Sequence, residues 1–146
     1  MATVIAAPRD EVWAVVGDIA SHVRWMEDAV AIRFLSGQRA GVGTRFLCET
    51  KFGPFRLEDD IEVVGWRDGE EIAIRHTGLV SGVGRFLLED YSAATRFSWE
   101  EELRLPRRLG GAAGGVVARP LLERAWRRNL GNLKSLVEDQ PRAGGT

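Results

Sequence analysis

The feature that most constrains the fold is the C-terminal segment 112–139, whose apolar residues recur with the spacing of an α-helix. They follow one another at steps of four, four, three and four: Leu122, Trp126, Leu130, Leu133 and Val137. This spacing places them on a single helix face. The opposite face is basic, with Arg124, Arg127, Arg128 and Lys134. A helix with a wide apolar stripe must cover another apolar surface. Because the preceding chain reads mainly as strands, we predict that this helix packs on one curved sheet.

Between residues 29 and 105 the apolar period changes from helical to two. The first predicted strand contains Val30, Ile32 and Phe34, and glycine or hairpin signals follow at 41–44, 53–54 and 67–69. One apolar and one polar face are typical of an antiparallel sheet covered on one side. Adding a short strand at 3–6, a helix starting near Pro8 and a second short helix or turn at 19–25 gives an α+β domain of about seven strands.

Composition limits the classes of function. The chain has 146 residues and a net charge of −1, which argues against a nucleic-acid or anionic-membrane partner. We expect one domain over 1–140 and a disordered tail over 141–146. Cys48 is the single cysteine, so no internal disulfide can form, and a reducing cytoplasm fits. The sequence contains no run of about 18 apolar residues, so we do not expect stable membrane insertion.

The order of strand, two short helices, six strands and long helix resembles the helix-grip fold of the START-like superfamily. Within it, the chain is similar to bacterial polyketide cyclase/dehydrase and lipid-transport (SRPBCC-type) proteins. The matching residues are Ile5-Ala6-Ala7-Pro8, Val12-Trp13, Asp18, Trp25, Gly41-Val42-Gly43-Thr44, Leu133-Lys134 and Glu138. Only six residues precede Ala7, where relatives usually have a longer first strand. A frayed first strand and a shortened chain therefore both stay open.

This resemblance implies a deep apolar cavity between sheet and helix, entered near the short helices, and it implies no cofactor. It carries no catalytic set with it. Some aromatic-polyketide cyclases place a tryptophan at the cavity near the second helix, where Trp25 matches, although packing of that helix on the sheet explains Trp25 equally well. The residues expected to contact a ligand are Trp25, Phe46, Ile61, Ile74, Phe86, Trp99, Trp126 and Leu130.

Three polar residues interrupt the inward apolar pattern: Asp59, His76 and Glu101. A buried charge needs a partner or water. If the hairpin turn is at 67–70, Ile61 faces His76 and Asp59 becomes its diagonal neighbour, while a turn at 91–94 places Glu101 opposite Gly84. His76 as acid or base, oriented by Asp59, with Glu101 as a second acid, could support proton transfer. A wet position near the strand ends, with ordinary ion pairs, explains the same residues. A neighbouring carboxylate raises the pKa of a histidine and burial lowers it, so the sign stays open.

Other site chemistry finds little support. No pair of cysteines or helical pair of histidines has the spacing of a zinc site, so no metal is expected. Cys48 is predicted to point inward as a small core residue. Two hypotheses remain: a cofactor-free cyclase or dehydratase acting on a polyketide-like molecule, and a non-catalytic carrier, sensor or sequestering protein for a lipid, quinone or antibiotic. Oligomeric state stays open.

Overall fold

The computed structural model describes residues 1–52, 54–78, 81–104 and 111–140, without the side chains of residues 52, 55 and 111–122. Its elements follow the predicted order. They are β1 (Ala2–Ile5), α1 (Arg9–Val16), the 3₁₀ helix η1 (Ile19–Arg24), β2 (Ala29–Phe34), β3 (Arg45–Phe52), β4 (Phe55–Arg67), β5 (Glu71–Thr77), β6 (Ser81–Tyr91), β7 (Ala94–Arg104) and α2 (Gly111–Glu138). The expected tail at 141–146 lies outside the described residues.

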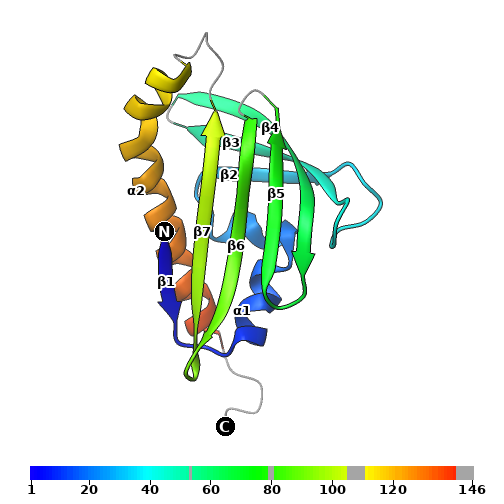
Figure 1. Ribbon diagram of the computed structural model, residues 1–146, viewed down its shortest axis with the longest axis vertical. Coiled ribbons are helices and arrows are strands. Elements are labelled where there is room, and N and C mark those ends of the chain that lie inside the picture. The colour runs from blue at the N-terminus through cyan, green and yellow to red at the C-terminus, as the bar shows by residue number, and fades with distance from the viewer. Residues whose placement is uncertain (53, 79–80, 105–110, 141–146) are drawn as a thin grey trace.

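The seven strands form one antiparallel sheet in the order β1-β7-β6-β5-β4-β3-β2. The sheet curves so that β2 and β3 cross behind the front strands, while α1 lies behind the sheet and α2 runs beside β1 and β7 (Figure 1). This arrangement confirms the predicted helix-grip fold, with a curved sheet and a long C-terminal helix.

The turn between β4 and β5 is the predicted hairpin signal. Gly69 has a φ of +78°, a backbone conformation that suits glycine, and the Glu70 N–H donates to the Arg67 carbonyl over 2.9 Å. This turn pairs Arg67 with Glu71, and a register shift between Val63 and Gly65 then brings Ile61 opposite His76. The pairing predicted from the sequence is therefore confirmed.

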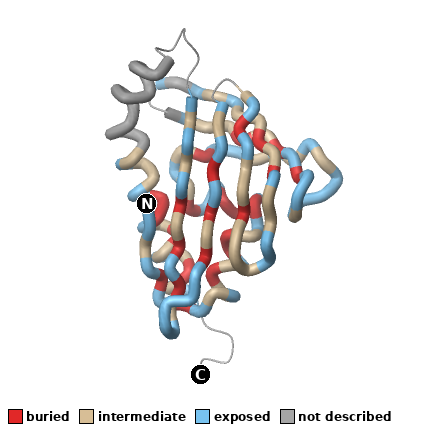
Figure 2. The backbone as a smooth tube through the Cα atoms, viewed as in Figure 1, coloured by how far each residue is buried: buried red, intermediate tan, exposed pale blue. Residues whose placement is uncertain are grey.

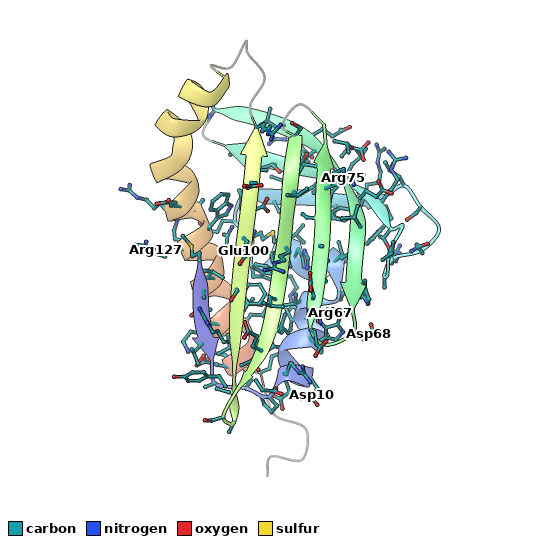
Figure 3. The ribbon with its side chains drawn as sticks, in the orientation of Figure 1. Asp10, Arg67, Asp68, Arg75, Glu100 and Arg127 are labelled. Carbon is teal, nitrogen blue, oxygen red and sulfur yellow. The ribbon has the colours of Figure 1, made fainter. Side chains whose placement is uncertain are left out.

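The core lies on the concave side of the sheet. Buried and exposed positions alternate along the front strands (Figure 2). Helix α2 presents the predicted face to this core, since Leu130, Leu133 and Val137 are buried and Trp126 is half-buried. Arg127 lies on the side of α2 away from the sheet, and Arg75 and Glu100 lie on the outer sheet face (Figure 3). Inward and outward positions are thus cleanly separated.

One strand departs from simple alternation. The pairing of β2 with β3 shifts between Ala29 and Ala31, so Val30 falls in an irregularity of the ladder. As a result Ala29 is buried and Val30 is 45% exposed. Val30, Ile32 and Phe34 lie in one strand as predicted, but Val30 does not share the partly buried side of Ile32 and Phe34, because the bulge inserts a residue and reverses the phase.

Polar contacts fasten α2 to the rest of the molecule. The Glu27 N–H donates to Asn129 Oδ1 over 3.0 Å, and Asn129 Nδ2 donates to Asp28 Oδ1 over 2.8 Å. Closer to the C-terminal end of α2, Lys134 Nζ donates to the Val4 carbonyl over 3.0 Å and pairs with Glu138. These bonds hold the helix to the loop after η1 and to strand β1, and so set its position over the concave face.

Candidate functional site

The two strand pairings bring together the three inward polar residues, which come from β4, β5 and β7. His76 Nδ1 lies 2.5 Å from Asp59 Oδ2, and His76 Nε2 lies 3.1 Å from Glu101 Oε2. Their side chains are 9%, 18% and 7% exposed for His76, Asp59 and Glu101 respectively. The imidazole is therefore bridged on both nitrogens by carboxylates, in largely dry surroundings. We refer to Asp59, His76 and Glu101 as the buried triad.

Glycines make this contact possible. Glu101 pairs across the sheet with Gly84, and a Cβ at Gly84 would lie 2.7 Å from Glu101 Cδ. That distance is well inside van der Waals contact, so any side chain at Gly84 would displace the carboxylate. The missing side chain allows Glu101 to lie across β6 and reach the ring of His76 on β5.

The buried triad holds its histidine in the charged form. Burial lowers the pKa of His76, but the hydrogen bonds to Asp59 and Glu101 and their negative charges outweigh burial and raise the pKa to about 10. The structure thereby decides the sign that the sequence left open. At neutral pH His76 is an imidazolium, which can donate a proton and cannot accept one.

Trp99 connects the buried triad to the apolar interior. Its indole Nε1–H donates to Glu101 Oε1 over 3.0 Å, and its ring centroid lies 5.9 Å from that of Trp126 and 6.0 Å from that of Trp25. Both oxygens of Glu101 are thus occupied. Polar and aromatic residues that the sequence analysis selected separately form one continuous cluster.

The remaining residues predicted to contact a ligand lie on the same concave side. Phe46, Ile61, Phe86 and Leu130 are buried, and Ile74 is partly buried against them. Trp25 is 1% exposed and packs against Phe86 and Phe97 in addition to Trp99. Their roles toward a ligand stay predictions.

His22 was not identified from the sequence. It lies on η1, three residues before Trp25. It is buried, its Nε2 lies 2.8 Å from the Val16 carbonyl, and its ring packs edge-on against Trp25 and Phe86. Burial lowers its pKa to about 4, with smaller opposing effects from Val16 and Asp18. His22 is therefore neutral at pH 7, whereas His76 is charged. A histidine within an otherwise apolar helical turn was the signal that could have identified it.

Two buried polar atoms have no hydrogen-bond partner among the described residues: Trp25 Nε1 and Asp59 Oδ1.

Cys48 faces Asp59 across β3 and β4. Burial, opposed by a hydrogen bond with Thr50, raises the pKa of the Cys48 thiol to about 11. The thiol is thus protonated at neutral pH and is a poor nucleophile.

A surface hollow of about 520 Å³ lies elsewhere, between the start of α1 and the turn from β4 to β5. Its lining includes Arg9, Trp13 and Asp90, and none of the predicted site residues is part of it.

In the described part of the chain, no group of three or more His, Cys, Asp or Glu residues has an arrangement suited to a metal ion. The same part contains no helix long and apolar enough to cross a membrane.

One of the comparisons with known proteins identifies a family. The profile of the family described as "Polyketide cyclase / dehydrase and lipid transport" matches residues 1–138. No curated protein matches the chain. Among solved structures, the Zhui aromatase/cyclase from Streptomyces sp. R1128 is similar with a TM-score of 0.75 and 19% identity, covering 99% of this chain and 95% of that one.

Two further structures have the same fold. A conserved protein from Geobacillus kaustophilus gives a TM-score of 0.78 at 10% identity, covering 94% of this chain and 93% of that one. The di-domain aromatase/cyclase BexL of the BE-7585A biosynthetic pathway gives 0.69 at 18% identity, covering 97% of this chain and 47% of that one. At these identities the structural likeness concerns the fold.

Proposed function

Because the chain belongs to the polyketide cyclase/dehydrase and lipid transport family, we propose that it binds a hydrophobic aromatic molecule between the sheet and α2 and acts on it as a cofactor-free cyclase or dehydratase. The observation that carries this proposal is the buried triad. A carrier needs only an apolar space and an entrance, whereas two carboxylates around an imidazolium add a proton donor and a base to that space.

The two contacts of the imidazolium suggest different roles for the carboxylates. The 2.5 Å contact with Asp59 is the shorter one and orients the ring, whereas the 3.1 Å contact with Glu101 is the one that a substrate oxygen can replace. His76 Nε2 then donates to that oxygen, and the released Glu101 carboxylate lies beside it as the base. Asp59 acts through His76 and is a positioning residue in this scheme.

This pair of groups is sufficient for an intramolecular aldol closure followed by loss of water. Glu101 removes a proton from a carbon beside a carbonyl, the resulting enolate carbon bonds to a second carbonyl carbon, and His76 gives its proton to the oxygen formed there. In the second stage His76 protonates the departing hydroxyl, and the carboxylate removes the neighbouring C–H proton. The proton that Glu101 gained in each stage returns to His76, so the protein ends unchanged and one water is released.

The test compares His76→Gln with Arg75→Gln, its neighbour on β5 that is exposed on the outer face. The substrate is a linear poly-β-ketone made in situ by a bacterial minimal aromatic polyketide synthase, with products identified by mass spectrometry. We expect His76→Gln to lower formation of the cyclised product by about 100-fold or more, and Arg75→Gln to leave it unchanged.

His76→Gln leaves two buried carboxylates without their cation, so loss of activity could reflect unfolding. Glu101→Gln serves as the second variant, because it keeps the His76–Asp59 pair and removes the base. Both variants are checked by thermal unfolding. Folded variants with wild-type product formation would rule out this catalytic assignment. Binding of the polyketide with no product in any form of the protein would favour the carrier instead.

A further inference from the structure

The buried triad contains one carboxylate oxygen that finds no donor in the described part of the chain. Asp59 Oδ2 contacts His76, and the two oxygens of Glu101 contact His76 and Trp99. Asp59 Oδ1 is buried and has no hydrogen-bond partner among the described residues. A buried acceptor without a donor is unfavourable, because it has lost its hydrogen bonds to water. A donor from a bound molecule would restore what is missing.

A glycine lies across the sheet from this oxygen. Continuing the pairing of Ile61 with His76 by two residues places Gly78 opposite Asp59. A Cβ at Gly78 would lie 3.2 Å from the Asp60 backbone nitrogen and 3.4 Å from Asp59 Oδ1, so glycine at this position keeps a side chain away from that oxygen in a tight strand contact. Asp59 is also the most exposed member of the buried triad, at 18% of its side chain. Asp59 Oδ1 is itself buried, so a ligand hydroxyl must enter the interior beside Asp59 to reach it.

Charge limits what that ligand group can be. The buried triad holds two acidic side chains and one histidine, so it has no spare cation for a further anion. Its neighbours Phe46, Cys48 and Ile61 are buried and provide no compensating cation. A carboxylate placed in this site would add a negative charge without a counterion in dry surroundings, which is costly. A neutral hydroxyl adds no charge and supplies the missing donor.

We propose that Asp59 Oδ1 accepts a hydrogen bond from a hydroxyl group of a neutral aromatic ligand, and that the buried triad excludes carboxylate ligands such as fatty acids. This inference rests on the proposed function, in that the ligand occupies the space between sheet and α2. It narrows the ligand from any apolar molecule to phenol- or enol-bearing ones. It also separates this chain from carriers of anionic lipids.

Three probes of one shape test the inference: 2-naphthol, 2-methoxynaphthalene and 2-naphthoate, titrated calorimetrically into the full chain at pH 7. They present a donor, an ether without a donor, and an anion on the same ring system. We expect 2-naphthol to bind at least about tenfold more tightly than 2-methoxynaphthalene, the usual effect of a hydrogen bond to a charged group. The carboxylate 2-naphthoate should bind at least about tenfold more weakly than 2-naphthol.

Asp59→Asn provides the matched variant, and Glu58→Gln, exposed beside it on β4, provides the control. Asp59→Asn should abolish the preference for 2-naphthol and improve binding of 2-naphthoate, while Glu58→Gln should behave as wild type. If Asp59→Asn fails to fold, the three probes on the wild-type chain still decide the question.

The outcomes separate the two proposals. Equal binding of all three probes, or tightest binding of 2-naphthoate, overturns the inference about ligand class and leaves interior binding intact. Absence of saturable binding for every probe overturns the inference together with the proposed function.

Discussion

The stability of the folded chain should fall as the pH rises above neutrality, because folding holds His76 in its protonated form. The pKa of His76 rises from 6.5 to about 10, since the contacts with Asp59 and Glu101 outweigh the opposing effect of burial. Between these values the folded chain keeps a proton that the unfolded chain has released. The stabilisation is therefore complete below pH 6.5 and is lost as the pH rises through 10.

The expected size follows from the linkage between protons and folding. One proton difference changes the free energy of unfolding by about 1.4 kcal/mol per pH unit. The whole range corresponds to roughly 5 kcal/mol, and the part between pH 6.5 and 9 to roughly 3 kcal/mol. Cys48 adds a further loss only above pH 9.0, the ordinary pKa of its thiol, because burial raises that pKa to about 11 in the folded chain. Measurements that stop at pH 9 therefore report mainly on His76.

Urea unfolding at several pH values between 6.5 and 9, followed by tryptophan fluorescence, measures this dependence. Arg75→Gln should keep the wild-type slope, because Arg75 is exposed on the outer side of the same strand. His76→Gln should remove most of the slope. A free energy of unfolding that is constant within about 0.5 kcal/mol across this range, the scale of ordinary surface effects, would refute the argument. It would mean that His76 is neutral in the folded chain and that the proton donor proposed above does not exist.

Three further predictions concern neighbouring parts of the structure. The variant Gly84→Ala should displace the Glu101 carboxylate, because the new Cβ would lie 2.7 Å from Glu101 Cδ. We expect the free energy of unfolding to depend less on pH, while the circular dichroism spectrum stays that of the wild type. An unchanged pH dependence would contradict the positioning role of Gly84. Truncating Leu130 to Ala should lower the free energy of unfolding by about 2–5 kcal/mol, because this residue of α2 is buried in the core. A loss below about 0.5 kcal/mol in urea unfolding would show that Leu130 is not on the face of α2 that packs against the sheet. The free energy of unfolding should also decrease as the pH falls from 6.5 to 4, because the buried His22 stays neutral in the folded chain while the same histidine takes up a proton in the unfolded chain. The variant His22→Gln should reduce this decrease in the same unfolding assay.

The contact between Asp59, His76 and Glu101 could be predicted because hairpin geometry is local. Counting outward from a turn at 67–70 puts Ile61 opposite His76, which is the observed pair. The observed turn instead pairs Arg67 with Glu71, and the register shift between Val63 and Gly65 restores the predicted pairing further along β4. The same reasoning places Glu101 opposite Gly84. A strand period of two then decides which of these residues point inward. Hairpin counting and the strand period thus brought together residues that are 17 and 25 positions apart, although on β4 the register shift offset an error of one residue at the turn.

Other features depend on information that no local pattern contains. The bulge that exposes Val30 depends on how β2 meets β3, and the sequence around it alternates normally. The bonds of Asn129 to the loop after η1 join residues about 100 positions apart. The charge of His76 depends on a balance between burial and two carboxylates, which only their distances decide. Sequence reasoning thus identified the groups of the site and could not determine their protonation.

The composition of the buried triad itself argues for a chemical role. Replacing a buried ion pair or triad by well-packed apolar residues is often neutral or stabilising, by roughly 1–4 kcal/mol in proteins where this has been measured. Strand pairing here needs none of the three side chains, since the ladders of β4, β5, β6 and β7 are made by the backbone. The chain nevertheless places two carboxylates and an imidazolium among Phe46, Ile61 and Trp99, and one carboxylate oxygen has no partner among the residues that the structure describes. A purely structural cluster would be expected to satisfy that oxygen from the protein. An arrangement that leaves an acceptor free beside a proton donor is better explained by a molecule that completes it on binding.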